Sequence, residues 1–213
     1  HCISKLKQIG LAVRMYTDDN DDYFIPQSVT DAAGVVIRYP AVVLPYVAGG
    51  EPTYANFQKY NVSSSSVFVC PSQTLQMATA DDSRYISYGL NEFFAWRFMK
   101  LKNGVDNTPI ASRRIQVPDI TLMLADTFYP SAATNKDNIG YFDLAANRIH
   151  ARHPNRGDDF QAGMFNLSWA DGHVTSESVN GYGSKYTDPG TVWNFYTKYS
   201  GYKSNATAIA EIL

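Results

Sequence analysis

The chain has 213 residues, with 18 lysines and arginines against 20 aspartates and glutamates, and a formal net charge of −2. A hydrophobic share of 45% argues against wholesale disorder, and the near-neutral charge argues against a nucleic-acid binder that works through a basic surface. Charged residues make up 18%, below the usual share of about 25%, and aromatic residues make up 14%, which favours an extracytoplasmic protein.

The first predicted element is an amphipathic helix over residues 1–17. Apolar side chains recur along it at spacings of 4, 3, 4 and 3, as one helical stripe requires: Cys2, Leu6, Ile9, Val13 and Tyr16. The sequence starts at His1 without Met or an N-cap residue, so we expect the helix to continue a longer one. The alternative is that His1 is an added residue before a complete domain. No run of about 20 apolar residues is present, and the part before His1 could be more helix, a membrane segment or a tag.

An acidic segment follows this helix. Asp18, Asn20 and Asp22 stand at positions 1, 3 and 5 of the calcium-loop pattern of EF-hands. The pattern then fails, because Tyr23 replaces the required Gly and Val29 replaces the required Glu. Two interpretations stay open here: a solvated acidic turn, and a weak Ca²⁺ site on these three residues.

Residues 35–48 are apolar but contain Pro40 and Pro45. Proline donates no backbone hydrogen bond, so we expect a short strand followed by irregular or helical packing. Residues 93–101 are rich in aromatic side chains and predict either a helix or an extended packing arm.

Three short apolar segments predict strands. Residues 67–72 predict a short buried strand that Pro71 ends, and residues 85–91 predict a second strand. Residues 120–126 are apolar almost throughout, which is typical of a strand buried on both faces. No repeat of 20–50 residues is visible, which excludes solenoids and propellers.

The two cysteines, Cys2 and Cys70, lie far apart in the sequence. Zinc sites usually show closely spaced cysteine or histidine pairs, so this spacing does not predict a metal framework. Two buried free thiols and a disulfide between the helix and the sheet both remain open, and the disulfide is favoured in an oxidising compartment.

The clearest local prediction is a β-hairpin over residues 164–175. Residues 164–169 alternate between apolar and polar side chains, which predicts a half-buried strand. Asp171 and Gly172 then supply turn residues that both tolerate positive φ, and residues 173–175 begin the return strand.

Three of the four histidines fall in the same region. His150, His153, His173 and Asp171 allow a functional reading as a metal or acid–base cluster. The favoured reading is structural, with His153 packed beneath the hairpin and Asp171 bonding the backbone of its own turn. Because the nucleophile-elbow, phosphate-loop, dinucleotide and zinc-protease motifs are absent, we expect that the chain is not an enzyme and has no cofactor.

Several short segments form an ordered series: Cys2–Ala12, Met15–Asp21, Phe68–Ser72, Ser87–Asn91, Arg152–His153 and Ala170–Val174. This series resembles large pseudopilin-like proteins of bacterial type II secretion, which have a prepilin-type cleavage and methylation site. His153, Asp171 and Gly172 match the His and Asp-Gly of the C-terminal motif of that family. The family commonly places nine residues between them, whereas seventeen lie between His153 and Asp171 here, which indicates an insertion around residues 155–162.

The resemblance implies an α+β, pilin-like fold with long loop insertions. Residues 1–17 would be the C-terminal half of the long helix, packed on an antiparallel sheet, and residues 18–213 would complete the same globular domain. It also implies an extracytoplasmic location, with an inner-membrane anchor outside this sequence and other pilin-like subunits as partners through the helix; no nucleic acid is expected. Related major pseudopilins bind calcium in a C-terminal loop that cannot be matched here residue by residue.

The sequence therefore predicts a structural, assembly-related subunit. The alternative is an extracellular carbohydrate- or polymer-binding module, because aromatic faces stack on sugars and the tail contains Trp193, Tyr196 and Tyr199. The third and weakest reading is a metal-dependent hydrolase built on the histidine group.

Overall fold

The computed structural model describes the following residues: 1–26, 28–30, 34–61, 66–72, 86–91, 111–115, 118–127, 140, 142–144, 149–153 and 164–178. The predictions made for residues 93–101 and for the aromatic tail lie outside these residues.

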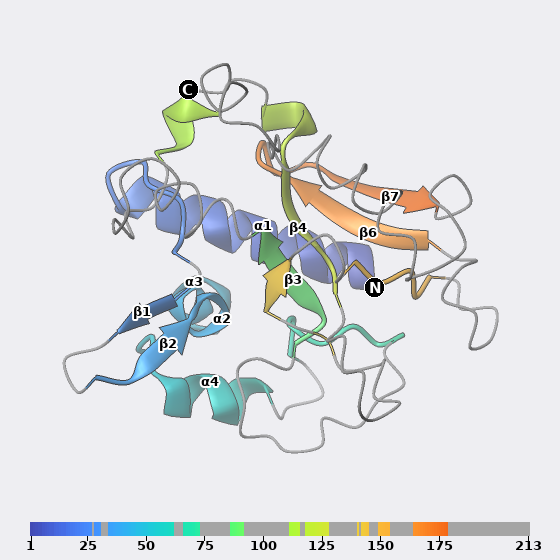
Figure 1. Ribbon diagram of the computed structural model, residues 1–213. Helices are drawn as coiled ribbons and strands as arrows, with labels where there is room; N and C mark the ends of the chain where they lie inside the picture. Colours follow the sequence, from blue (N-terminus) through green and yellow to red (C-terminus); the bar gives the residue numbers. More distant parts are fainter. Residues whose placement is uncertain are drawn as a thin grey trace.

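A five-stranded sheet lies at the centre of the fold (Figure 1). Neighbouring strands are antiparallel except β3 and β5, which run parallel. The described residues therefore form the predicted α+β arrangement of a helix and a mainly antiparallel sheet. In spatial order the strands are β5 (Asp143–Leu144), β3 (Tyr88–Asn91), β4 (Leu122–Asp126), β6 (Met164–Trp169) and β7 (Val174–Ser178).

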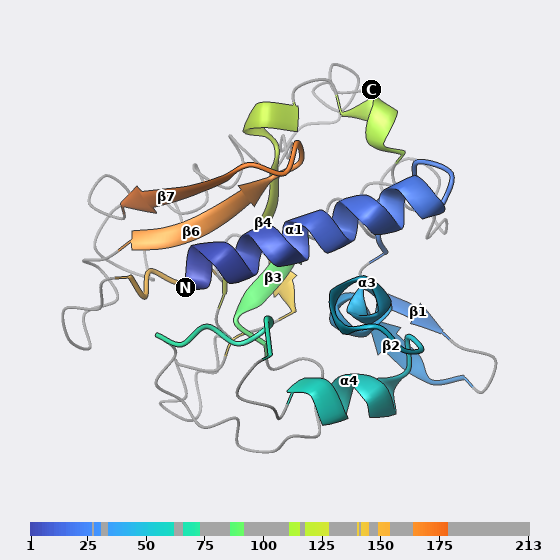
Figure 2. The ribbon, with the colours of Figure 1, turned by 180° about the vertical axis from the view of Figure 1, so that it is seen from behind.

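The predicted N-terminal helix is confirmed as α1 (Cys2–Asp19), which lies across one face of the sheet (Figure 2). It comes close to β6 at Gly10, where an added Cβ would lie 3.0 Å from Ser168 Oγ. No helix in the described ranges combines the length and apolar character needed to cross a bilayer. The predicted stripe faces the core, because the buried residues of α1 are Cys2, Leu6, Ile9, Gly10, Ala12, Val13 and Thr17.

Two central strands are buried on both faces. This confirms the prediction for β4, all of whose residues are buried. For β6 the prediction of a half-buried strand is wrong, because Asn166 and Ser168 are buried as well. Ser168 faces α1, and the Asn166 amide donates to Asp126 Oδ2 at 3.1 Å, so the polar face of β6 is covered by the helix and bonded internally.

The predicted hairpin joins β6 to β7. Gly172 N donates to Trp169 O at 2.9 Å, and Trp169 N donates to His173 O at 2.9 Å. Gly172 has φ of 93°, whereas Asp171 does not adopt positive φ as expected. This pattern matches a type I turn followed by a left-handed glycine, which is a three-residue hairpin loop. Such a loop needs positive φ at one residue, whereas a two-residue type I′ loop needs it at two.

A second, smaller unit packs near the C-terminal half of α1. The prediction for residues 35–48 is confirmed, because a strand is followed by two short helices that each carry proline in the first turn. Tyr46 from this unit meets Tyr16 of α1 edge-on, with ring centroids 6.1 Å apart. Its elements are β1 (Ser28–Thr30), β2 (Val36–Arg38), α2 (Tyr39–Val42), α3 (Leu44–Ala48) and α4 (Tyr54–Asn61).

The strand predicted at residues 67–72 is wrong, because these residues form turns. Their backbone groups bond to a side chain and to one residue before β3: Lys5 Nζ donates to Val69 O at 2.9 Å, and Ser87 N donates to Phe68 O at 2.8 Å. Phe68 is nevertheless fully buried, with its ring 5.5 Å from that of Phe57. The strand predicted at 85–91 is present as β3, and short 3₁₀ turns occupy Ser112–Arg114 and Pro118–Ile120.

Candidate functional site

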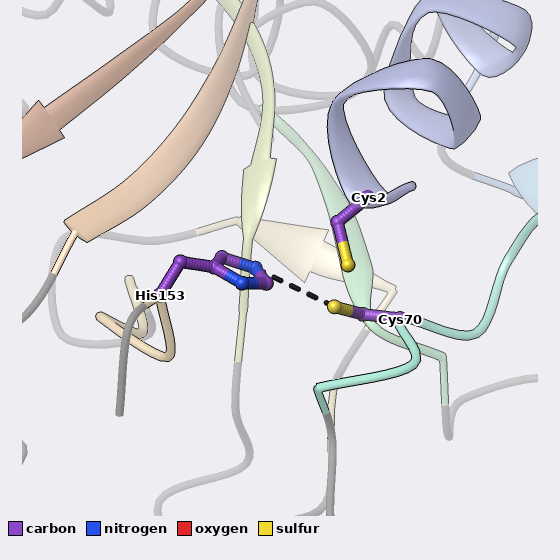
Figure 3. Close-up of side chains that lie close together, drawn as sticks. All are labelled: Cys2, Cys70 and His153. Carbon is purple, nitrogen blue, oxygen red and sulfur yellow. Dashed lines mark hydrogen bonds between the residues drawn. The ribbon is translucent and has the colours of Figure 1, made fainter. Parts of the chain in front are cut away.

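Three potential metal ligands from distant parts of the chain meet at one point (Figure 3). Cys2 comes from the start of α1, Cys70 from the turns before β3, and His153 from a bridge to β6. Their ligand atoms all lie within 4.8 Å of one another, and Cys70 Sγ is 3.4 Å from His153 Nε2. Among the residues that the structure describes, this is the one group of three or more such side chains that could hold a metal ion.

Cys2 is fixed by contacts at both its backbone and its side chain. Tyr88 Oη donates to Cys2 O at 3.3 Å, and the Cys2 sulfur lies 3.9 Å from Ser72 Oγ. One turn further along α1, Lys5 Nζ donates to Ser66 O at 2.7 Å. The first turn of the helix is therefore held against the segment that carries Cys70.

Cys70 is fully buried and is held through its backbone. Its N–H donates to Ser87 Oγ at 2.6 Å, next to the start of β3. His153 pairs with Met164 as an isolated antiparallel bridge, in which His153 N donates to Met164 O at 2.8 Å. His153 is thus positioned by its backbone bridge to β6, and Cys70 by a hydrogen bond to the Ser87 side chain just before β3.

A buried ionic network lies directly behind His153. His153 Nε2 is 3.2 Å from Asp126 Oδ2, and Arg152 Nε is 3.7 Å from Asp126 Oδ1. Asp126 Oδ2 also accepts from the backbone N of Asn166 at 2.8 Å, and the Arg152 guanidinium donates to Thr127 O. Asp126 is 0% exposed and Arg152 2%, so the two charges are removed from water. Hydrogen bonds from Asn166 to Asp126 and from Arg152 to Thr127 O surround the pair.

The sequence reasoning missed Asp126 and Arg152 as parts of the site. A signal was present, because Asp126 ends an otherwise apolar strand that is buried on both faces. An ionised side chain at such a position needs a buried partner, and Arg152 with its neighbour His153 was a candidate pair in the sequence.

The charges of the three ligand residues are strongly linked. The Cys70 thiol donates to Cys2 and so lowers the pKa of Cys2, while the same contact and burial raise the pKa of Cys70. Burial tends to lower the pKa of His153, but its hydrogen bonds to Asp126 and Cys2 prevail and raise the pKa to about 9. These contacts favour a thiolate on Cys2 and the protonated form of His153.

The alternative reading of the sequence, a cluster of three histidines and Asp171, does not form among the described residues. Within the described ranges, His150, His153, His173 and Asp171 do not gather as metal ligands. His173 and Asp171 pair at the exposed hairpin, with Nδ1 and Oδ1 2.6 Å apart, and the His173 ring stacks on Trp169. The structural reading of Asp171 is confirmed, because its carboxylate accepts from His173 N at 3.0 Å.

The other candidate residues have separate outcomes. Each member of the acidic segment bonds to a different partner: Asp18 to Arg14, Asn20 to Tyr16 O and Asp22 to Ser112. A Ca²⁺ site there stays a prediction. Cys2 and Cys70 are free and buried in the structure, and a disulfide between them also stays a prediction. Trp193, Tyr196 and Tyr199 lie outside the described residues.

Comparison of the chain with models of protein families, with curated protein sequences and with solved structures gave no match.

His150 gives a testable pH dependence of stability. Burial, with the nearby charges of Arg152 and His153, lowers the pKa of His150 to about 2 from 6.5. Below pH 6.5 the unfolded state therefore binds a proton that the folded state excludes. Because that proton favours the unfolded state, the free energy of unfolding is highest above pH 6.5 and decreases as the pH falls. Between about pH 7.5 and pH 5, His150 should lower the free energy of unfolding by about 2 kcal/mol.

Urea unfolding followed by circular dichroism over this pH range tests the prediction. His150→Gln should flatten the pH dependence by that amount, whatever its effect at pH 7.5. His173→Gln removes a histidine of the exposed hairpin and is the matched control, which should change the slope much less than His150→Gln. An unchanged slope in His150→Gln would contradict the assignment.

Proposed function

We propose that this chain is the globular domain of a pilin-like assembly subunit, held at a membrane by a segment outside this sequence and acting on the extracytoplasmic side. The observation that carries the proposal is the outward face of α1. Ile3, Leu11 and Met15 are exposed by 42%, 61% and 43%, and their spacings of eight and four residues place them on one side of the helix. The opposite side of α1 packs into the core.

An apolar outer face suits a helix that packs against other helices. Single exposed apolar residues are common on soluble proteins, and three that share one side of a helix offer apolar area for contact with another helix. Lys7 lies between Ile3 and Leu11 on the same side of the helix, and Arg14 lies beside them, so the exposed side of α1 carries both apolar and basic side chains, and the charges would keep it soluble before assembly. The ordered series of segments that resembles pseudopilin-like proteins supports the same role, and the proposal gives the chain no catalytic activity.

Two experiments test the proposal. The gene should encode about 20 apolar residues directly before His1, preceded by a short basic leader. In the full-length protein, Leu11→Lys should lower the yield of chemically cross-linked oligomers in membranes about tenfold, because a contact of about 1.4 kcal/mol is lost.

Val29→Lys is the matched control, because Val29 is also exposed but lies on β1. It should leave the cross-linked yield unchanged. A gene that begins at His1 would contradict the proposal, and so would an equal loss of cross-linked yield in Leu11→Lys and Val29→Lys.

A further inference from the structure

We propose that Cys2, Cys70 and His153 bind a zinc ion. The inference rests on the convergence of two thiols and an imidazole from three separate segments, and it uses none of the residues that carry the proposed assembly role. It is an alternative to the disulfide, because a bond between Cys2 and Cys70 would leave no thiolate for the ion. Cys2 is 8% exposed, Cys70 0% and His153 17%, so the site would be largely shielded from water.

The distances fit a tetrahedral ion. Zn–S bonds of about 2.3 Å and Zn–N bonds of about 2.0–2.1 Å give an S–N edge of about 3.5 Å and an S–S edge of about 3.8 Å. Cys70 Sγ and His153 Nε2 are 3.4 Å apart, and Cys2 Sγ lies within 4.8 Å of both atoms. Only a small movement of the Cys2 side chain would complete the three-ligand face.

The chemistry of the donors selects the ion. Sulfur and imidazole nitrogen are preferred by zinc, whereas calcium and magnesium require oxygen. On binding, the ion would replace the proton on His153 Nε2, the atom that lies 3.2 Å from Asp126 Oδ2. Two thiolates and the neutral imidazole would then neutralise a divalent ion, and Asp126 would keep Arg152 as its counter-ion. A buried site with no net charge avoids the large desolvation penalty of an isolated ion.

Bound zinc would join segments that are distant in sequence. It would link the first turn of α1 to the turns before β3 and to the bridge beside β6. Since the three ligands come together only in the folded chain, zinc binding would raise the melting temperature of the protein. The ion would hold the first turn of α1 in a fixed position relative to the sheet.

Titration of reduced, tag-free protein with Co²⁺ provides the direct test, because Co²⁺ substitutes for zinc and reports its ligands by absorption. We expect one Co²⁺ per chain, with thiolate charge-transfer bands in the near ultraviolet and strong tetrahedral bands in the visible. Zinc should displace the cobalt, and elemental analysis should then find one zinc per chain.

The variants locate the ion. Cys2→Ser and His153→Gln should each weaken binding by about 100-fold or more, since loss of an outer-shell partner alone costs about 10–100-fold. They should also lose the increase in melting temperature on adding zinc, while circular dichroism checks that each variant is folded. His173→Gln, the exposed histidine of the hairpin, is the control and should bind as wild type.

Two outcomes would overturn the proposal. The first is reduced, folded wild-type protein that shows no thiolate charge-transfer band with Co²⁺. The second is binding that is equally tight in wild type, Cys2→Ser and His153→Gln, which would place the ion elsewhere.

Discussion

Replacing Asp126 with asparagine is expected to lower the free energy of unfolding by about 3–5 kcal/mol, the range found when one partner of a buried ion pair is removed. Asparagine has nearly the same size, so no cavity is created. The substitution takes a carboxylate from beside Arg152, which is 2% exposed and therefore far from water. It also replaces an acceptor of two hydrogen bonds from Asn166.

Urea unfolding of wild type and Asp126→Asn measures this difference. Asp171→Asn is the matched control, because Asp171 also pairs with a histidine but lies at the exposed hairpin. An exposed pair contributes little, so the control should lose less than about 1 kcal/mol. Equal losses in the two variants would show that burial of Asp126 does not set its contribution.

Replacing Gly140 with alanine is expected to lower the free energy of unfolding by about 3 kcal/mol, the upper part of the range for overpacked cores. A Cβ at this position would lie 1.8 Å from Ile86 O and 2.8 Å from Ser87 Cα. These are backbone atoms, and Ser87 also holds Cys70 through its hydroxyl. Relief of the clash therefore requires a shift of the chain that enters β3.

Gly10→Ala is the control for this experiment. Its Cβ would lie 3.0 Å from Ser168 Oγ, a side-chain atom that can rotate away. Alanine also favours the helix by about 1 kcal/mol over glycine, which offsets the contact. Thermal unfolding of both variants should show a large loss for Gly140→Ala and a change near zero for Gly10→Ala; the reverse order would contradict the packing described for Gly140.

Elements with a strong local pattern could be predicted from the sequence. The 4–3 spacing along residues 2–16 predicts α1, and Asp171–Gly172 predicts the hairpin, because both depend on neighbours in the chain. The alternation in β6 led to a wrong prediction, since it cannot show that a helix covers the polar face. The turns at residues 67–72 were also misassigned, because Lys5 replaces a neighbouring strand as their bonding partner.

The candidate site depends on contacts that the sequence does not encode locally. Cys70 and His153 are separated by 83 positions, so a rule based on close spacing along the chain could not reveal that their side chains meet. The histidines grouped by sequence proximity, His150 and His153, take different roles: one is buried and neutral, and the other faces the cysteines. Only the placement of α1 on the sheet brings Cys2 into this group.

The position of α1 against β4 and β6 also has a consequence during synthesis. α1 is synthesised before β4 and β6, the strands that cover its apolar face, which follow more than a hundred residues later, with β6 ending at Trp169. At a synthesis rate of about 5–20 residues per second, the apolar face of α1 stays uncovered by these strands for on the order of ten seconds. Exposed apolar surface on a nascent chain is prone to aggregation and is a binding site for chaperones. We therefore expect ribosome profiling with chaperone pull-down to find binding from the emergence of α1 until β6 is complete.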